Sequence, residues 1–187
     1  MAGTIRAFIA VEIPSGVRQD LSTAITQLKK HRGDVKWVRP ESMHLTLKFL
    51  GDVRKEQFAD IESALKTALE WLSPFQVQIG GTGAFPNLKQ PRVFWVGLQT
   101  GAEVLTKAAA RIEDAFASLG FPKEKRAYSP HLTLGRVRSM HQIDQVSQAV
   151  SVLKIASEPF TVNRVVLMQS DLKPTGAEYT PVFHIQF

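Results

Sequence analysis

Apolar and polar residues alternate in some segments of the chain and recur every three or four residues in others. A period of two predicts strands with one buried face, and a period near 3.6 predicts amphipathic helices. Read in this way, each half of the chain has the order strand, helix, strand, helix, strand. Strands are expected at 5–13, 44–51, 77–79, 92–99, 131–137, 160–169 and 179–187.

Apolar stripes between these strands predict the helices, and their side chains are expected to form the core. The stripes are Val17, Leu21, Ile25 and Leu28; Phe58, Ile61, Leu65, Leu69 and Leu72; Val104, Ala108, Ile112 and Leu119; and Val146, Val150 and Leu153. Ser15 is expected to cap the first helix, and Gly51 to end the strand that begins at His44. Loops are expected at 31–36, 80–91, 120–130 and 170–178.

The two halves also resemble each other in sequence. Residues 6–11 resemble residues 92–97, and residues 74–77 resemble residues 159–162, at offsets of 86 and 85. The tetrapeptide His-Leu-Thr-Leu occurs at 44–47 and again at 131–134, at an offset of 87. Three matches in the same order at nearly one spacing predict a pseudo-twofold, bilobal protein. The expected organisation is a single domain, residues 1–187, whose equivalent lobes are approximately 1–90 and 91–187.

Composition narrows the class of protein. A chain of 187 residues fits one domain or two small lobes that share a core. It contains no cysteine, which excludes disulfides, thiolate metal sites and a cysteine nucleophile. The apolar run at the start is too short for a signal peptide and is broken by Glu12, and no stretch approaches the ~20 apolar residues of a membrane span. A cytoplasmic location and no membrane contact are therefore expected.

The charge balance favours an anionic partner. Lys and Arg number 23 against 17 acidic residues, which gives a net charge of +6. Such an excess favours nucleic acid or phosphate esters. The basic residues that flank the two tetrapeptides could form a collar for an RNA end. They are Lys36, Arg39, Lys123, Lys125, Arg126 and Arg138.

The repeated tetrapeptide carries the candidate chemistry. Successive side chains on a strand point to opposite faces, so His44 and Thr46 share one face while the leucines anchor the other. The same holds for His131 and Thr133. If the pseudo-twofold brings these strands together, two imidazoles and two hydroxyls line one cleft. One histidine can take a proton and the other can give one, while the hydroxyls donate to phosphate oxygens, which suits cleavage of a phosphodiester.

The histidines also allow two other interpretations. A buried histidine hydrogen-bonded to a threonine is common in cores and would explain either motif alone, but not its repetition. A metal site is not expected, because the chain has no His-x-x-x-His, no His-x-His and no cysteine. Beside the first motif, Lys48 shares the parity of His44 and could attract phosphate or be a solvated strand end. Phe49 has core parity, and alternatively could stack on a base.

Four segments together resemble a known family. They are Arg6–Pro14, Met43–Gly51, Ser129–Arg136 and Tyr179–Pro181. The pattern resembles the two-histidine phosphoesterase superfamily and, within it, the bacterial and archaeal RNA 2′,3′-cyclic phosphodiesterases, also called 2′-5′ RNA ligases. The resemblance implies an α+β fold with two lobes, each an antiparallel sheet with helices packed on it, around a shared active-site cleft.

The resemblance also implies a reaction and roles for residues. A terminal 2′,3′-cyclic phosphate would be opened without a metal or cofactor to a 2′-phosphate and a free 3′-OH, with 2′-5′ ligation as a possible reverse reaction. His44 would be the proton donor and His131 the proton acceptor, although the symmetry of the halves leaves this assignment open from the residues alone. Thr46, Thr133 and Arg136 would contact the phosphate. Arg136 has the wrong strand parity for this, so a bulge at Gly135 is expected.

The substrate remains open at this level. The same residues would suit RNA ends, small cyclic nucleotides or 2′-5′ oligonucleotides, and a non-catalytic binder of RNA ends would need the cleft but not both histidines. A monomer is expected.

Overall fold

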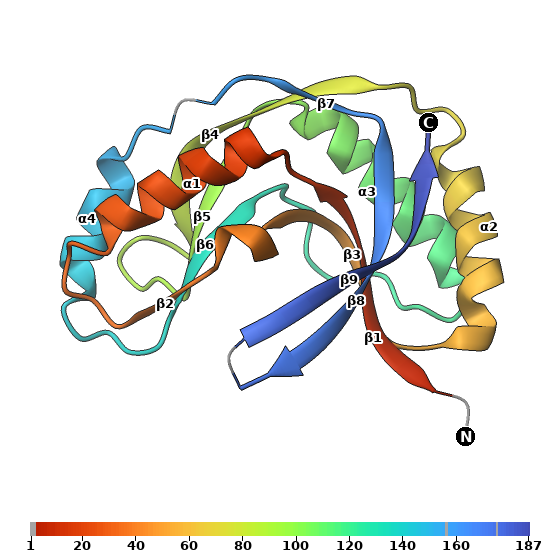
Figure 1. The fold of residues 1–187 in the computed structure, drawn as a ribbon, viewed down its shortest axis with the longest axis horizontal. Helices are drawn as coiled ribbons and strands as arrows, with labels where there is room; N and C mark the ends of the chain where they lie inside the picture. Colours follow the sequence, from red (N-terminus) through yellow and green to blue (C-terminus); the bar gives the residue numbers. More distant parts are fainter. Residues whose placement is uncertain (1–2, 156, 175) are drawn as a thin grey trace.

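The computed structural model describes residues 3–155, 157–174 and 176–187 (Figure 1). The strands are β1 (Thr4–Glu12), β2 (Val35–Trp37), β3 (His44–Arg54), β4 (Phe75–Phe85), β5 (Val93–Thr100), β6 (Leu132–Val137), β7 (Phe160–Val162), β8 (Arg164–Lys173) and β9 (Gly176–Gln186). The helices are α1 (Ser15–Leu28), α2 (Phe58–Leu69), α3 (Ala102–Ala117) and α4 (Ile143–Val152), with short 3-10 turns η1 (Pro40–Ser42) and η2 (Lys55–Gln57).

The strands form two antiparallel sheets. One has the order β3-β1-β8-β9 and the other the order β2-β6-β5-β4-β7. Helices α2 and α3 pack on each other and α3 packs on β3, whereas α4 packs on β4 of the second sheet and α1 contacts α4 (Figure 1). The α+β class and the two-lobed arrangement of antiparallel sheets with packed helices are therefore confirmed.

The pseudo-twofold repeat is visible in the strand pairing. In the first sheet β1 pairs with β3 and β8, and in the second sheet β5 pairs with β6 and β4. The third strand of each repeat thus crosses into the sheet of the other repeat. The boundary near residue 90 separates the repeated segments but not the two sheets, and the crossing strands join both lobes in one core.

The repeated segments at Pro74 and Pro159 meet each other. Phe75 pairs with Val162 and Val77 pairs with Phe160, so the same two positions of each repeat exchange partners. The side chain of Gln76 donates to Thr161 Oγ1 at 2.8 Å between them. This reciprocal pairing is the pattern that a twofold axis produces.

Several local predictions need correction. Pro14 occupies the position before α1 and makes no side-chain cap, so Ser15 begins the helix instead of capping it. Strand β3 does not end at Gly51 but continues to Arg54, because Leu50 forms a bulge and Gly51 takes a positive φ of 72°. Strand β4 runs through residues 80–85, which were expected to be loop.

The segment 170–178, expected to be a loop, mostly belongs to the β8–β9 hairpin. The short strand β2 was also not expected. No helix within the described residues has the length and apolar character required to cross a membrane.

Candidate active site

Both copies of the repeated motif lie at one cavity. His44 begins β3, and His131 directly precedes β6. The cavity has a volume of ≈ 530 Å³, and both histidines and both motif threonines line it. The first leucine of each motif, Leu45 and Leu132, is fully buried on the other face. The alternation that the sequence predicts thus holds up to each threonine.

A bulge follows the threonine in each strand. Thr46 and Lys48 lie opposite consecutive residues of β1, which leaves Leu47 as the extra residue. In β6, Leu134 is the extra residue in the same way. A bulge reverses the alternation beyond it. The expected bulge is therefore present at Leu134, one residue before Gly135.

The reversal brings the residue three positions after each threonine to the cavity. These residues are Phe49 in β3 and Arg136 in β6, and both are exposed and line the cavity. Arg136 therefore lines the same cavity as both motif histidines and both motif threonines. The expectation that Phe49 is a core residue is wrong, because its side chain is 58% exposed.

The same bulge removes Lys48 from the cleft face. Lys48 is 1% exposed, and its Nζ donates to Glu113 Oε2 at 2.7 Å and to the Pro122 carbonyl at 2.9 Å. The expectation that it attracts phosphate is wrong, since its charge is buried and already paired. The equivalent position in β6 is Gly135, where a Cβ would lie only 2.6 Å from Val35 of the neighbouring strand β2.

The two histidine rings are oriented in the same way. His44 Nδ1 lies 3.1 Å from the Ser42 carbonyl, and His131 Nδ1 lies 2.7 Å from the Ser129 carbonyl. A carbonyl can only accept, so each Nδ1 carries a hydrogen and donates it. Each Nε2 is then the atom that can accept or donate a proton during a reaction.

The surroundings of the two histidines differ. The His44 ring stacks on the Phe8 ring, with their centroids 4.5 Å apart. The rings of His44 and Tyr179 are nearly perpendicular, with their centroids 5.0 Å apart. Burial between these rings lowers the pKa of His44 to about 4, against the opposing effect of the hydrogen bond to Ser42. The His131 ring instead meets the ring of Phe85 in an edge-to-face arrangement, with the two centroids 5.0 Å apart. The free protein therefore holds His44 neutral at pH 7.

Two arginines make this cavity electropositive. Arg6 and Arg136 both line it, and neither forms an ion pair with any described residue. Burial raises the pKa of the Tyr179 hydroxyl, and the nearby charges of Arg136 and Arg6 act in the opposite direction. Such a site attracts an anion and stabilises added negative charge.

Sequence reasoning did not assign four of these residues to the site. They are Arg6, Phe8, Phe85 and Tyr179. Arg6, Phe8 and Tyr179 belong to segments already noted for their resemblance, which was an available signal. Nothing in the sequence distinguished Phe85 from a core residue.

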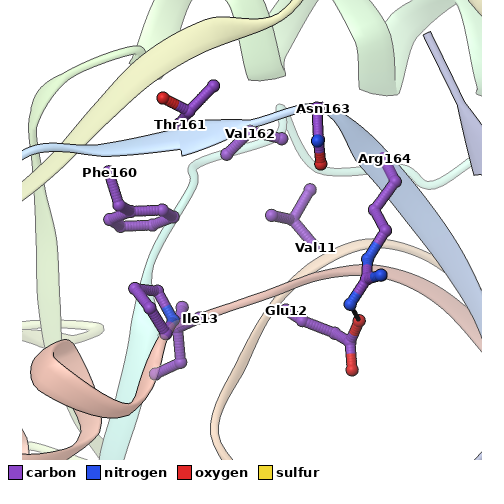
Figure 2. Close-up of a pocket in the computed structure, with 9 residues that line it drawn as sticks. Val11, Glu12, Ile13, Phe160, Thr161, Val162, Asn163 and Arg164 are labelled. Atoms are coloured by element: carbon purple, nitrogen blue, oxygen red, sulfur yellow. Dashed lines mark hydrogen bonds and ion pairs between the residues drawn. The ribbon is translucent and has the colours of Figure 1, made fainter.

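Another cavity, of ≈ 370 Å³, lies between the end of β1 and the strands β7 and β8 (Figure 2). There Arg164 donates to Glu12 Oε2 at 2.9 Å, and Figure 2 shows the two side chains facing each other. Neither motif histidine lines it, so it is not part of the candidate active site. Across the described residues, no cluster of three or more His, Cys, Asp or Glu side chains could hold a metal ion.

Comparison with known proteins identifies relatives along nearly the whole chain. The sequence profile described as the 2′-5′ RNA ligase superfamily matches residues 17–174. The RNA 2′,3′-cyclic phosphodiesterase of Methanothermobacter thermautotrophicus is 36% identical over 177 residues, which cover 94% of this chain and 95% of that protein.

Solved structures of similar fold also match nearly the whole chain. TT0787 of Thermus thermophilus has a TM-score of 0.81 at 30% identity, covering 97% of each chain. E. coli LigT complexed with 3′-AMP has a TM-score of 0.74 at 25% identity, covering 99% of each chain. These matches confirm the resemblance noted from the four sequence segments.

Proposed function

The chain belongs to the 2′-5′ RNA ligase superfamily and is an enzyme of its RNA 2′,3′-cyclic phosphodiesterase group, and we propose that it opens the cyclic phosphate by two-histidine acid–base catalysis. The observation that carries this proposal is the pair of imidazoles in one electropositive cavity, each tied through Nδ1 to a carbonyl. That arrangement leaves both Nε2 atoms available to the same substrate.

In the proposed reaction His131 Nε2 takes a proton from water, and the water oxygen attacks phosphorus. The bond from phosphorus to the 3′ oxygen breaks, and His44 Nε2 gives its proton to that oxygen. The products are a 2′-phosphomonoester and a free 3′-OH. Proton exchange with solvent then restores both histidines, and no other co-reactant is required.

His44 must be protonated to act as the donor, although burial lowers its pKa in the free protein. An anionic phosphate beside Nε2 favours the imidazolium and opposes the effect of burial. Substrate binding is therefore part of the proposal: the phosphate itself prepares the acid. Thr46, Thr133 and Arg136 donate to the non-bridging oxygens, and Arg6 adds to the positive field.

The remaining parts of the proposal concern the protein as a whole. We infer one catalytic domain that works as a monomer in the cytoplasm, on RNA ends or nucleotides that bear a 2′,3′-cyclic phosphate. Catalysis requires neither a metal nor a cofactor, since the two histidines supply both proton transfers. Ligation of a cyclic end is the same displacement with a 5′-OH in place of water: the 5′ oxygen attacks phosphorus, the bond to the 3′ oxygen breaks, and a 2′-5′ phosphodiester forms.

A sulfur-substituted substrate tests the roles of the two histidines. A 3′ sulfur leaves without help from an acid, so His44→Ala should lose most activity on the normal cyclic phosphate and regain it on the 3′-thio analogue. His131→Ala should stay inactive on both. Rescue of His131→Ala instead would exchange the two roles, and full activity of either variant on the normal substrate would contradict the two-histidine mechanism.

A further inference from the structure

The segment that leads to His131 has no regular structure of its own. Residues 122–130 lie outside every helix and strand, and no backbone–backbone hydrogen bond joins them to another described residue. Yet this segment contains Ser129, whose carbonyl accepts the hydrogen of His131 Nδ1. The hydrogen bond made by one ring nitrogen decides which nitrogen is free to react. The orientation of the reacting imidazole therefore depends on what holds this segment.

The first motif is built differently. Its orienting carbonyl belongs to Ser42, in the 3-10 turn η1. That turn closes backbone hydrogen bonds of its own, such as the one from the Ser42 N–H to the Arg39 carbonyl at 2.9 Å. The turn thus fixes the carbonyl beside His44 locally, whereas the carbonyl beside His131 requires support from outside its segment.

Lys48 and Glu113 provide that support. The bulge in β3 turns Lys48 away from the cavity, and its Nζ donates to Glu113 Oε2 at 2.7 Å and to the Pro122 carbonyl at 2.9 Å. The same Glu113 oxygen accepts the N–H of Glu124 at 3.1 Å. One buried cation on the strand of the first motif and one carboxylate of α3 therefore hold the segment before the second motif by two of its backbone groups.

The other contacts of the segment are weaker or less directional. Lys123 pairs with Asp114 of α3, but their side chains are 57% and 70% exposed, and an exposed ion pair contributes little. Tyr128 packs on the core, yet its hydroxyl has no hydrogen-bond partner among the described residues. Apolar packing is non-directional, whereas hydrogen bonds to a charged group are short and fix geometry. The Lys48–Glu113 pair is therefore the contact that sets where the segment lies.

We propose that Lys48 and Glu113 are positioning residues for His131. They fix residues 122–130, and thereby the Ser129 carbonyl that orients the imidazole. This rests on the proposed function, in which His131 takes the proton from water. A displacement of about 1 Å in a reacting group can cost on the order of 100-fold in rate, so the pair acts on turnover without touching the substrate.

Two variants separate this role from a merely structural one. Lys48→Met combined with Glu113→Leu replaces the buried pair by apolar side chains of similar size, which preserves most of the stability but releases both backbone groups of the segment. Its kcat for a short RNA with a terminal 2′,3′-cyclic phosphate should fall about 10- to 100-fold, with little change in KM. Glu113→Gln should have the opposite effects. Its amide oxygen still accepts from Lys48 and Glu124, so it should regain most of the kcat that the double variant loses, although loss of the charge lowers stability.

Lys66→Met combined with Glu62→Leu is the matched control, because this exposed ion pair of α2 has the same separation of 2.7 Å. The control should keep the wild-type kcat. Urea unfolding of each variant shows whether kcat follows stability. A kcat that follows stability across the variants would overturn the positioning role, as would an unchanged kcat in the Lys48–Glu113 double variant or an effect confined to KM.

Nitrogen NMR of the imidazoles reads the orientation of His131 without any turnover. At about pH 9, where an imidazole is ordinarily neutral, the hydrogen of the wild-type ring should lie on Nδ1. In the double variant the Ser129 carbonyl is displaced, and the form with the hydrogen on Nε2 should appear as well. His44, held by η1, should keep its hydrogen on Nδ1 in both proteins. An unchanged His131 ring would overturn the inference. Failure of the wild type to open the cyclic phosphate would instead overturn the proposed function, while the NMR comparison would still decide whether the pair orients His131.

Discussion

Removing Lys48 alone is expected to destabilise the fold far more than removing an exposed lysine. In Lys48→Met the Glu113 carboxylate keeps its charge but loses the ammonium 2.7 Å away, and the Pro122 carbonyl loses a donor. Breaking a buried ion pair from one side costs about 3–5 kcal/mol. The Glu113 side chain is 17% exposed and retains some water, so we expect a loss of about 3 kcal/mol in the free energy of unfolding.

The chain provides a matched control. Lys66 and Glu62 form an ion pair with the same separation of 2.7 Å, but their side chains are 62% and 41% exposed. An exposed pair of this spacing on a helix contributes about 0.3–0.5 kcal/mol, so Lys66→Met should lose no more than that. Urea unfolding measures both variants, from the midpoint and the slope of each transition. Similar losses in Lys48→Met and Lys66→Met would refute the reasoning.

A double variant separates the pair from the lysine itself. Replacing a buried ion pair by apolar side chains is often neutral or stabilising, so Lys48→Met combined with Glu113→Leu should recover most of the lost stability. The recovery appears as an interaction energy in a double-mutant cycle. Simple addition of the two single losses would mean that Lys48 and Glu113 are not coupled.

The desolvation of His44 and the two motif hydroxyls have measurable consequences as well. Tyr179→Ala opens one side of the His44 ring to water, so NMR titration should find its pKa raised from about 4 toward 6.5; an unchanged value would mean that Tyr179 does not desolvate the ring. Because the lowered pKa makes the unfolded state bind more protons between pH 6.5 and 4, stability should fall as the pH falls through that window. Over this range the wild type should lose about 2–3 kcal/mol more than His44→Gln in urea unfolding, and equal losses would contradict a buried, neutral His44. Thr46→Val and Thr133→Val keep the side-chain shape but remove a donor, so kcat/KM for the cyclic phosphate should fall about 10- to 100-fold; a wild-type rate in both would exclude the hydroxyls from the mechanism.

Local periodicity was sufficient to predict the helices. The stripe of Val17, Leu21, Ile25 and Leu28 is buried in α1, and Val146 and Val150 are buried in α4. The repeated tetrapeptide likewise predicted that His44 and His131 lie at one cavity. These predictions required only two kinds of information: which face of each element is apolar, and the assumption that a twofold axis relates the two halves.

Side-chain direction beyond the threonines could not be predicted, because it depends on the bulges at Leu47 and Leu134. A bulge arises from pairing with a neighbouring strand, which alternation along one strand does not reveal. It buries Lys48, exposes Phe49 and turns Arg136 to the cavity. The expected bulge near Gly135 came from the role that Arg136 required and not from the local pattern.

Two further features depend on the assembled fold: which strands belong to which sheet, and how deeply each of the two motif histidines is buried. Nothing in β4 or β8 alone indicates that each crosses to the sheet of the other repeat. Similarly, the two motifs are identical in sequence, yet only the His44 ring lies between Phe8 and Tyr179. Burial by residues from distant strands therefore produces an asymmetry that two identical tetrapeptides cannot encode.

The most direct test of the central claim is hydrolysis of a short RNA that ends in a 2′,3′-cyclic phosphate, with EDTA present and with the product identified. We expect a 2′-phosphate product from the wild type and little or none from His44→Ala or His131→Ala. Turnover that stops in EDTA and returns with a divalent ion, or that survives in either variant, would contradict metal-free catalysis by the two histidines.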